Sequence, residues 1–238
     1  MAVKPAHFAL LLGVIAALLL LAAGPGTRLD VWDFRTGFQL MRWAAFAGLG
    51  AAALAAVMLL LPRTRRGGLA ALLAALALGL GTAFVPWNAL RQARALPPIH
   101  DITTDTGRPP QFVAILPLRA AAPNPATYGG PDVARAQIGA YPELRTHRMD
   151  AAPAEAFKRA LQTARDTGWE IAAADAAAGR IEATDTTFWF GFKDDVVIRV
   201  EADGAGSRVD VRSVSRVGVS DVGANARRIR AYLRVLGP

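Results

Sequence analysis

Three stretches of the chain contain no Asp, Glu, Lys or Arg, and they constrain the fold more than any other feature. They run over residues 8–27, 43–62 and 67–90, so each is 20 to 24 residues long. A helix rises about 1.5 Å per residue and needs about 20 apolar residues to cross roughly 30 Å of hydrocarbon. The sequence therefore predicts three transmembrane helices, at about 8–23, 43–61 and 69–87.

The first stretch has an alternative interpretation as a cleaved signal peptide, because Lys4 precedes its apolar run. Against this, Leu21-Ala22-Ala23-Gly24 is a poor cleavage site, and two further apolar stretches follow directly. We therefore expect residues 1–95 to form a membrane anchor of three helices. The spans carry no acidic residue or lysine that could serve a proton or ion pathway, so an anchor is favoured over a transporter.

Small residues recur at every fourth position in the second and third spans: Ala44, Gly48, Ala52, Ala71, Ala75 and Gly79. This spacing lets helix backbones approach closely. We expect the second helix to pack on the third, or on a second copy in a homo-oligomer. Because alanine is abundant in this chain, chance recurrence stays open as an alternative.

The orientation of the anchor rests on the basic residues of its short loops, because Lys and Arg favour the cytoplasmic side. Arg63, Arg65 and Arg66 crowd the tight loop between the second and third spans, on the same side as Lys4. The arginines predicted on the other side are spread along longer segments: Arg28, Arg35, Arg42, Arg91 and Arg94. This density predicts a cytoplasmic N-terminus and a C-terminal domain outside the cytoplasm.

Composition excludes several classes of protein. Among 238 residues there is no cysteine, which excludes disulfide scaffolds, cysteine zinc sites and thiol catalysis. The hydrophobic content of 53% excludes a disordered chain. The net charge is +8. Residues 1–90 contribute +5, from 7 basic and 2 acidic side chains, and residues 91–238 contribute +3, from 20 basic and 17 acidic side chains. Because the second part is nearly balanced and its charges alternate, we expect no nucleic-acid partner.

After the proline pair at 97–98 the sequence becomes charged and mixed, and it predicts a soluble α+β domain over residues 96–238. Residues 98–152 are rich in Pro and Gly, so we expect little regular structure there. Helical spacing follows Pro153 and ends at Gly168, and a closing helix is expected over 222–236. Between these two main packing helices we expect an antiparallel β-meander of about four strands: one starting at 169, then 179–190, 195–201 and 207–217.

Catalytic and metal-binding patterns are absent from the sequence. His7, His100 and His147 are far apart and do not have the spacing of metal ligands. Residues 218–222 lack the last glycine of a G-x-S-x-G nucleophile motif, and there is no glycine-rich phosphate loop. We therefore expect no catalytic residues, no metal and no cofactor.

The densest polar constellation spans residues 212–225, where a strand leads into the N-terminus of a helix. Backbone N–H groups at such a terminus favour anions, which suggests a small anionic ligand or a lipid headgroup. The candidate ligand-binding residues are Arg212, Ser213, Ser215, Arg216, Ser220 and Asn225. Strand alternation places the two serines and the two arginines on opposite faces. The alternative interpretation is a structural corner held by ion pairs and by Ser220 or Asp221 as the helix cap.

This constellation and six shorter stretches resemble the family catalogued as domain of unknown function 1499 (DUF1499). The matching segments are 99–105, 109–112, 128–130, 140–142, 179–186, 191–196 and 212–225. The family is common in bacteria and also occurs in plant plastids, and its bacterial members carry an N-terminal anchor with several spans. The resemblance implies membrane attachment and a domain beginning near residue 98, but no activity and no catalytic residues.

Two hypotheses for the function follow. The first is a non-enzymatic, multi-pass protein of the bacterial inner membrane, whose periplasmic domain binds a protein partner or a small, lipid-like ligand in the cell envelope. The second is a hydrolase or transferase acting on an envelope substrate. The second requires carboxylates to converge with an arginine in one cleft. The available carboxylates are Asp101, Asp105, Glu182 and Asp221.

Overall fold

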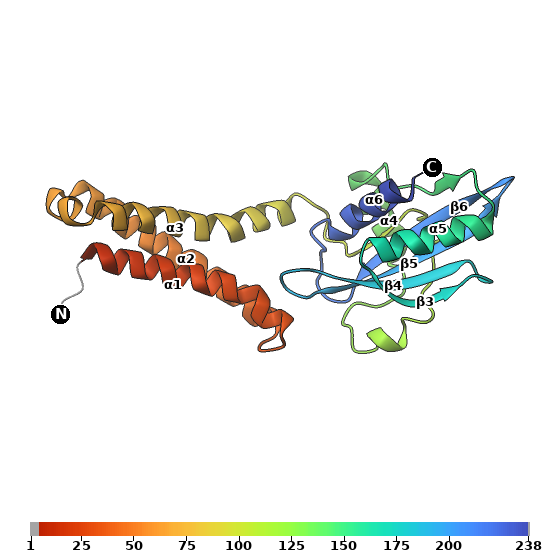
Figure 1. Ribbon diagram of the computed structural model, residues 1–238, viewed down its shortest axis with the longest axis horizontal. Helices are drawn as coiled ribbons and strands as arrows, with labels where there is room; N and C mark the ends of the chain where they lie inside the picture. Colours follow the sequence, from red (N-terminus) through yellow and green to blue (C-terminus); the bar gives the residue numbers. More distant parts are fainter. Residues whose placement is uncertain (1–4, 238) are drawn as a thin grey trace. The chain divides into compact units, whose positions relative to one another are not determined.

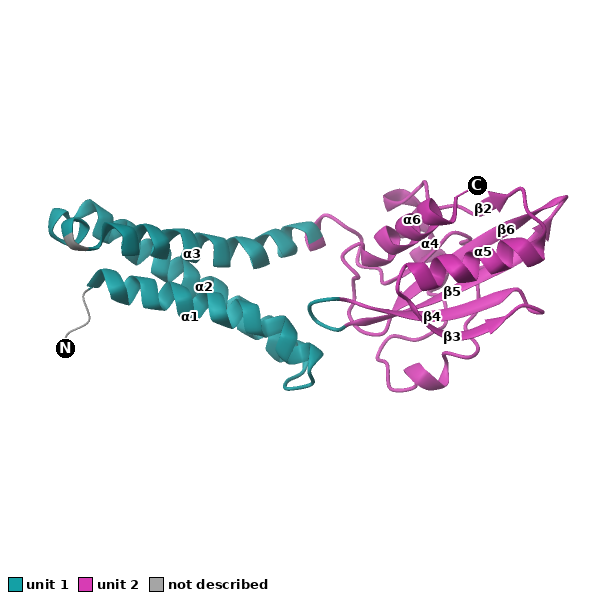
Figure 2. Cartoon of the chain, viewed as in Figure 1, with its two compact units in different colours: residues 1–92, 188–191 teal, residues 93–187, 192–238 magenta. Residues whose placement is uncertain are grey.

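The computed structural model describes residues 5–237, which form two compact units (Figures 1 and 2). Of the described residues, unit 1 contains 5–92 together with 188–191, and unit 2 contains 93–187 and 192–237. Unit 1 is helical, whereas unit 2 combines an antiparallel sheet with helices. The three apolar helices followed by an α+β domain confirm the predicted fold class.

Unit 1 is built from α1 (Pro5–Arg28), α2 (Phe34–Leu60) and α3 (Pro62–Arg94). Within residues 5–237, three helical segments are long and apolar enough to cross a membrane: Pro5–Arg28, Phe34–Leu60 and Gly68–Arg94. α3 has non-helical backbone angles at Gly68, which separates its basic first turns from the apolar part. The start of α2 is capped by Asp33, whose Oδ1 accepts hydrogen bonds from the N–H groups of Arg35 (2.7 Å) and Thr36 (3.1 Å).

α2 and α3 approach each other at the small residues that recur every fourth position. A Cβ built on Gly48 would lie 2.8 Å from the carbonyl oxygen of Gly79, so this crossing excludes any side chain at Gly48. Gly50 and Gly81 lie on other faces of the same helices, and a Cβ on either would have no neighbour within 4 Å. The second helix therefore packs on the third, which is one of the two arrangements that the spacing predicts.

Unit 2 is organised around an antiparallel sheet with the strand order β1-β6-β5-β4-β3, and β2 also pairs with β6. Among residues 5–237 the sheet has six strands: β1 (Asp101–Thr103), β2 (His147–Met149), β3 (Glu170–Asp175), β4 (Arg180–Thr186), β5 (Lys193–Asp203) and β6 (Gly206–Ser215). The expected four-strand meander corresponds to β3–β6. The helices of the unit are α4 (Gly130–Ala140), α5 (Pro153–Asp166) and α6 (Ala224–Leu236), with a 3₁₀ turn η1 (Pro117–Arg119).

Two expectations about this unit were wrong. The segment 98–152 is more regular than expected, because it contains β1, η1, α4 and β2. β1 and β2 have three residues each and gain their regularity from pairing with β6, which their own sequence does not reveal. In α4 the Gly-Pro pair that indicated a loop instead begins the helix, with proline in its first turn. β4 also ends at Thr186 rather than continuing to residue 190.

One face of the sheet packs against α5 and α6, and Figure 1 shows both helices over the same side. Val196, Ile198 and Val211 face these helices and are fully buried with Ile229 of α6. Tyr232 of α6 joins the two helices, since its hydroxyl donates to the carbonyl of Ala160 in α5 at 2.8 Å. Both helices therefore pack against the sheet, as the sequence predicts for the two main helices of the domain.

The other face of the sheet is covered by the irregular segment 104–128. Phe112 and Ile115 from this segment form a small apolar cluster with Val197 and Val214. Charged side chains surround this cluster, and several are fully buried, including Arg212 and Glu182. Both faces of the sheet are therefore buried, one by apolar helices and the other by a polar layer.

The glycine contact between α2 and α3 can be tested with a matched pair of substitutions. Gly79→Leu should destabilise the full chain in detergent by about 1 to 3 kcal/mol, the usual cost of overpacking. Gly81→Leu should have little effect, because its position has open space. Thermal loss of helicity measured by circular dichroism distinguishes the variants. Equal melting curves for both would contradict the close approach of α2 and α3.

Candidate functional site

The corner between β6 and α6 brings together Ser213, Ser215 and Asn225, all three of them buried. The Oγ of Ser213 donates to Oδ1 of Asn225 at 2.7 Å. Nδ2 of Asn225 donates to the Oγ of Ser215 at 3.0 Å and to the carbonyl of His100 at 2.9 Å. Because these groups bind one another and the backbone, the corner fastens α6 and the chain before β1 to the end of β6.

The turn into α6 is held by Ser220 and Asp221. The Oγ of Ser220 accepts a hydrogen bond from the N–H of Val222 at 3.2 Å. The carboxylate of Asp221 accepts from the N–H groups of Gly223 (2.9 Å) and Asn225 (2.7 Å). Burial raises the pKa of Asp221, and these two N–H groups oppose the shift. Asp221 therefore occupies N–H groups at the helix start that an anion would otherwise use.

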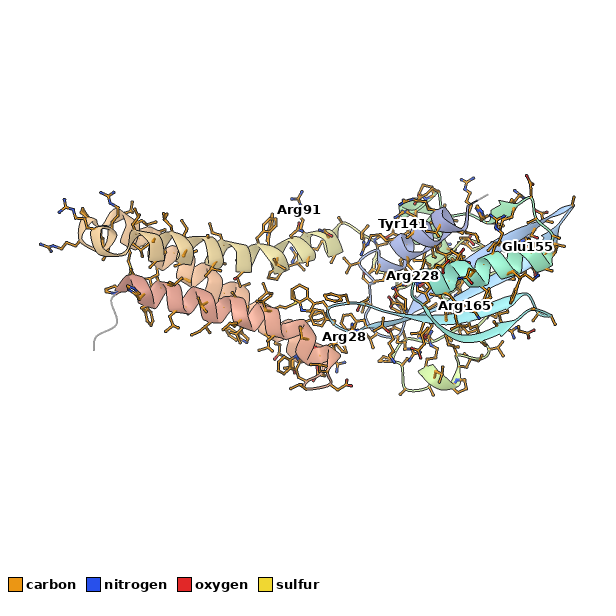
Figure 3. All side chains as sticks on the ribbon, in the orientation of Figure 1. Arg28, Arg91, Tyr141, Glu155, Arg165 and Arg228 are labelled. Carbon is orange, nitrogen blue, oxygen red and sulfur yellow. The ribbon has the colours of Figure 1, made fainter. Side chains whose placement is uncertain are left out.

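Arg228 closes the same corner from α6 (Figure 3). Its guanidinium donates to Oδ2 of Asp185 at 2.7 Å and to Oδ2 of Asp194 at 2.6 Å. It also donates to the Oγ of Ser213 at 3.1 Å. One arginine of α6 thus binds a residue on each of the three neighbouring strands β4, β5 and β6.

Arg212 lies on the opposite face of β6 and is completely buried. Its Nε and Nη2 donate to the two carboxylate oxygens of Asp101 at 2.9 and 2.7 Å. Its remaining hydrogen bonds go to the carbonyls of Pro110 (3.1 Å) and Ala126 (2.7 Å) in the covering segment. Burial raises the pKa of Asp101, and the neighbouring Arg212 opposes that shift. Four of the five N–H groups of this guanidinium therefore donate to acceptors within the chain.

Arg216 binds a second buried carboxylate on that face. Its Nε and Nη2 donate to the two oxygens of Asp195 at 2.9 and 2.8 Å, and its Nη1 donates to the carbonyl of Leu118 at 3.0 Å. Nη1 of Arg119 lies 3.2 Å from the same carboxylate. Like Arg212, Arg216 fastens the covering segment to the sheet.

The six candidate ligand-binding residues consequently lie in three places. Ser213, Ser215 and Asn225 are on the helix side of the sheet, and Arg212 and Arg216 are on the other side, as strand alternation predicts. Ser220 lies in the turn before α6. The structure thus separates the arginines from the serines, and each of the six makes hydrogen bonds within the chain.

The four carboxylates of the hydrolase hypothesis also have separate partners. Asp101 pairs with Arg212, and Asp221 caps α6. Asp105 pairs with Arg199 and Arg208. The carboxylate of Glu182 pairs with Arg180 and also accepts hydrogen bonds at 3.0 to 3.1 Å from three successive backbone N–H groups, those of Val113, Ala114 and Ile115. Each carboxylate has its own structural role, and the structure does not gather the four around one arginine.

The sequence interpretation missed the ionic cluster around Asp210, which is fully buried. Its carboxylate accepts hydrogen bonds from Thr104, Thr146, Arg199 and Arg208. Burial alone would raise the pKa of Asp210, but the bonds from Thr146, Arg199 and Arg208 outweigh it and hold the pKa below its usual range. The sequence did contain a sign of this ionic cluster, because charged residues alternate with uncharged ones along parts of both β5 and β6 and so lie on one face of the sheet.

Across residues 5–237 the structure holds no group of three or more His, Asp or Glu side chains placed to bind a metal. An open depression of about 530 Å³ lies in unit 1, where its lining includes His7 and Leu10 of α1 and Arg66 of α3. None of the six candidate residues contributes to it.

Replacing Arg212 distinguishes a structural role from a ligand-binding role. Arg212→Ala should lower the free energy of unfolding of unit 2 by about 3 to 5 kcal/mol, because it leaves Asp101 as a buried, unpaired charge. Urea denaturation of the full chain in detergent, followed by pulse proteolysis, measures this loss.

Arg148→Ala is the matched control, since Arg148 pairs with Asp203 at an exposed site where the side chains are 79% and 38% accessible. It should change the stability by about 1 kcal/mol or less. A stability of Arg212→Ala equal to that of the control would show that Arg212 does not hold the covering segment.

Comparison with known proteins gives one family match. The family model described as "Protein of unknown function (DUF1499)" matches residues 101–236, which run from the start of β1 to the end of α6. A search of curated proteins gives no match. The match covers more than half of the chain, including the corner at 212–225 and the covering segment, and the protein therefore belongs to the DUF1499 family.

Proposed function

We propose that the protein is a non-enzymatic binding protein of the bacterial inner membrane, whose α+β domain lies in the periplasm and binds a partner protein of the cell envelope. The three apolar helices support its association with a membrane. The internal pairing of the six candidate residues favours a protein partner over a small, lipid-like ligand. The separate partners of the four carboxylates likewise give the hydrolase or transferase alternative no support.

The observation that carries this proposal is a set of three exposed apolar side chains on the covering segment. Val113, Leu116 and Leu118 lie within six residues of one another and are 51%, 44% and 60% exposed. Clusters of exposed apolar side chains on a domain surface are typical of interaction sites. We refer to these three residues as the 113–118 patch.

The backbone that carries the patch is firmly attached to the sheet. Glu182 binds the N–H groups of residues 113–115, and Arg216 binds the carbonyl of Leu118. Because the segment is already ordered, a partner that binds it would lose little affinity to the ordering of a loop. Three apolar side chains on a preorganised backbone therefore suit a protein surface.

Photo-crosslinking in cells tests the proposal. A photoreactive amino acid at Leu118 in the full chain should give a discrete protein adduct, which mass spectrometry identifies. Leu118→Asp should then abolish co-purification of that protein, because it places a charge in an apolar contact.

Ala177→Asp, in the exposed turn between β3 and β4, is the matched control and should leave co-purification unchanged. An adduct of the chain with itself would identify a homo-oligomer as the partner. The proposal fails if crosslinkers at all three patch positions give no protein adduct.

The periplasmic location is tested separately. It rests on the dense arginines at 63–66, which favour the cytoplasm, and on three spans that place the two ends of the chain on opposite sides. Alkaline phosphatase fused after Pro238 should be active, and green fluorescent protein at the same place should be dark. The reverse result would place the domain in the cytoplasm.

A further inference from the structure

The turn between β4 and β5 carries three consecutive aromatic residues, Phe188, Trp189 and Phe190. The turn has a defined shape, because the N–H of Thr187 donates to the carbonyl of Phe192 at 2.8 Å. The N–H of Phe192 in return donates to the Oγ1 of Thr187 at 2.8 Å. The side chain of Phe188 is 92% exposed, the largest exposure among the large hydrophobic residues described. In water such a ring forgoes the free energy that its burial would provide.

The linker from α3 enters the domain close to the end of β6. α3 ends at Arg94, and the carbonyls of Ile99 and His100 already accept backbone hydrogen bonds from Asp221 (3.1 Å) and Ser215 (3.0 Å). Four residues lie between Arg94 and Ile99, so five Cα–Cα steps join them, and an extended chain covers at most about 3.6 Å per step, or roughly 18 Å in all. The linker between the last apolar helix and this end of the domain is therefore short.

The aromatic turn extends from the same end of the sheet. Asp101, at the start of β1, lies opposite Val214, and Asp195 lies between Val214 and Thr184 across the next two strands. Neighbouring strands are about 4.8 Å apart, so roughly 14 Å separates the entry of the linker from β4. β1 begins at the same end of the sheet at which β4 ends. The linker before β1 and the aromatic turn after β4 therefore both extend beyond that end of the sheet.

We infer that the turn 188–191 inserts into the lipid–water interface of the membrane and serves as a second attachment point for the domain. Trp and other amphipathic aromatic rings favour the level of the lipid headgroups. Lys193 follows the turn and is exposed, so its ammonium group is suited to lipid phosphates. The inference depends on neither the 113–118 patch nor its partner.

The absence of cysteine from the chain makes a direct test simple. The full chain with Phe188→Cys is labelled with an environment-sensitive fluorophore and reconstituted into phosphatidylcholine–phosphatidylglycerol vesicles. Ala205→Cys, in the exposed turn between β5 and β6 at the other end of the sheet, is the matched control. The label at 188 should show blue-shifted emission and quenching by lipids that carry a nitroxide near the headgroup. The label at 205 should show neither.

A second variant tests whether the neighbouring aromatic ring contributes to the insertion of the turn. Trp189→Ser in the Phe188→Cys background should reduce the quenching by nitroxide lipids while leaving the urea midpoint of the domain unchanged. Equal quenching at positions 188 and 205 would overturn the inference. Blue-shifted emission at 188 without quenching by lipid would also overturn it, because the turn would then be packed against protein. A protein adduct at the 113–118 patch leaves each of these outcomes unaffected.

Discussion

The guanidinium of Arg212 carries a positive charge at a site with no exposure to water, and the second layer of the domain is arranged around it. Such a charge is tolerated only when its desolvation is offset by a close counter-charge and a full set of hydrogen bonds. Asp101 supplies the counter-charge, and the carbonyls of Pro110 and Ala126 supply the remaining bonds. The path of the segment 104–128 across the sheet is consequently set by electrostatics as much as by its few apolar contacts.

This arrangement explains why polar residues that look functional in the sequence are used inside the domain. The backbone of an irregular segment has N–H and C=O groups that no neighbouring strand satisfies, and burying it requires side-chain partners. Glu182 satisfies three such N–H groups, and Arg216 satisfies the carbonyl of Leu118. Most of the ionic chemistry of the sheet is thereby directed inward, which leaves apolar side chains for the outer surface of the same segment.

The sequence was most informative where one periodicity dominated. The apolar helices, α5, α6 and the strands β3–β6 all follow from spacing, and so does the division of Arg212 from Ser213. Short strands such as β1 could not be predicted, because their stability comes from pairing with β6, more than 100 residues away. The partners of the buried charges were also hidden, since Asp101 and Arg212 meet only after the sheet has formed. Local pattern therefore revealed the elements, whereas the interior of the candidate site depended on contacts between distant segments.

The strand order has a consequence for how the domain is made. β6 lies between β5 on one side and β1 and β2 on the other, yet it is the last strand to be synthesised. Contacts between residues this distant in sequence form slowly, because a long loop must close first. Until β6 emerges, β1 has no strand to pair with and Asp101 has no Arg212 to bind. The domain therefore reaches its native fold only after β6 has been produced, when the buried ion pairs of its second layer can form together with the strand pairings.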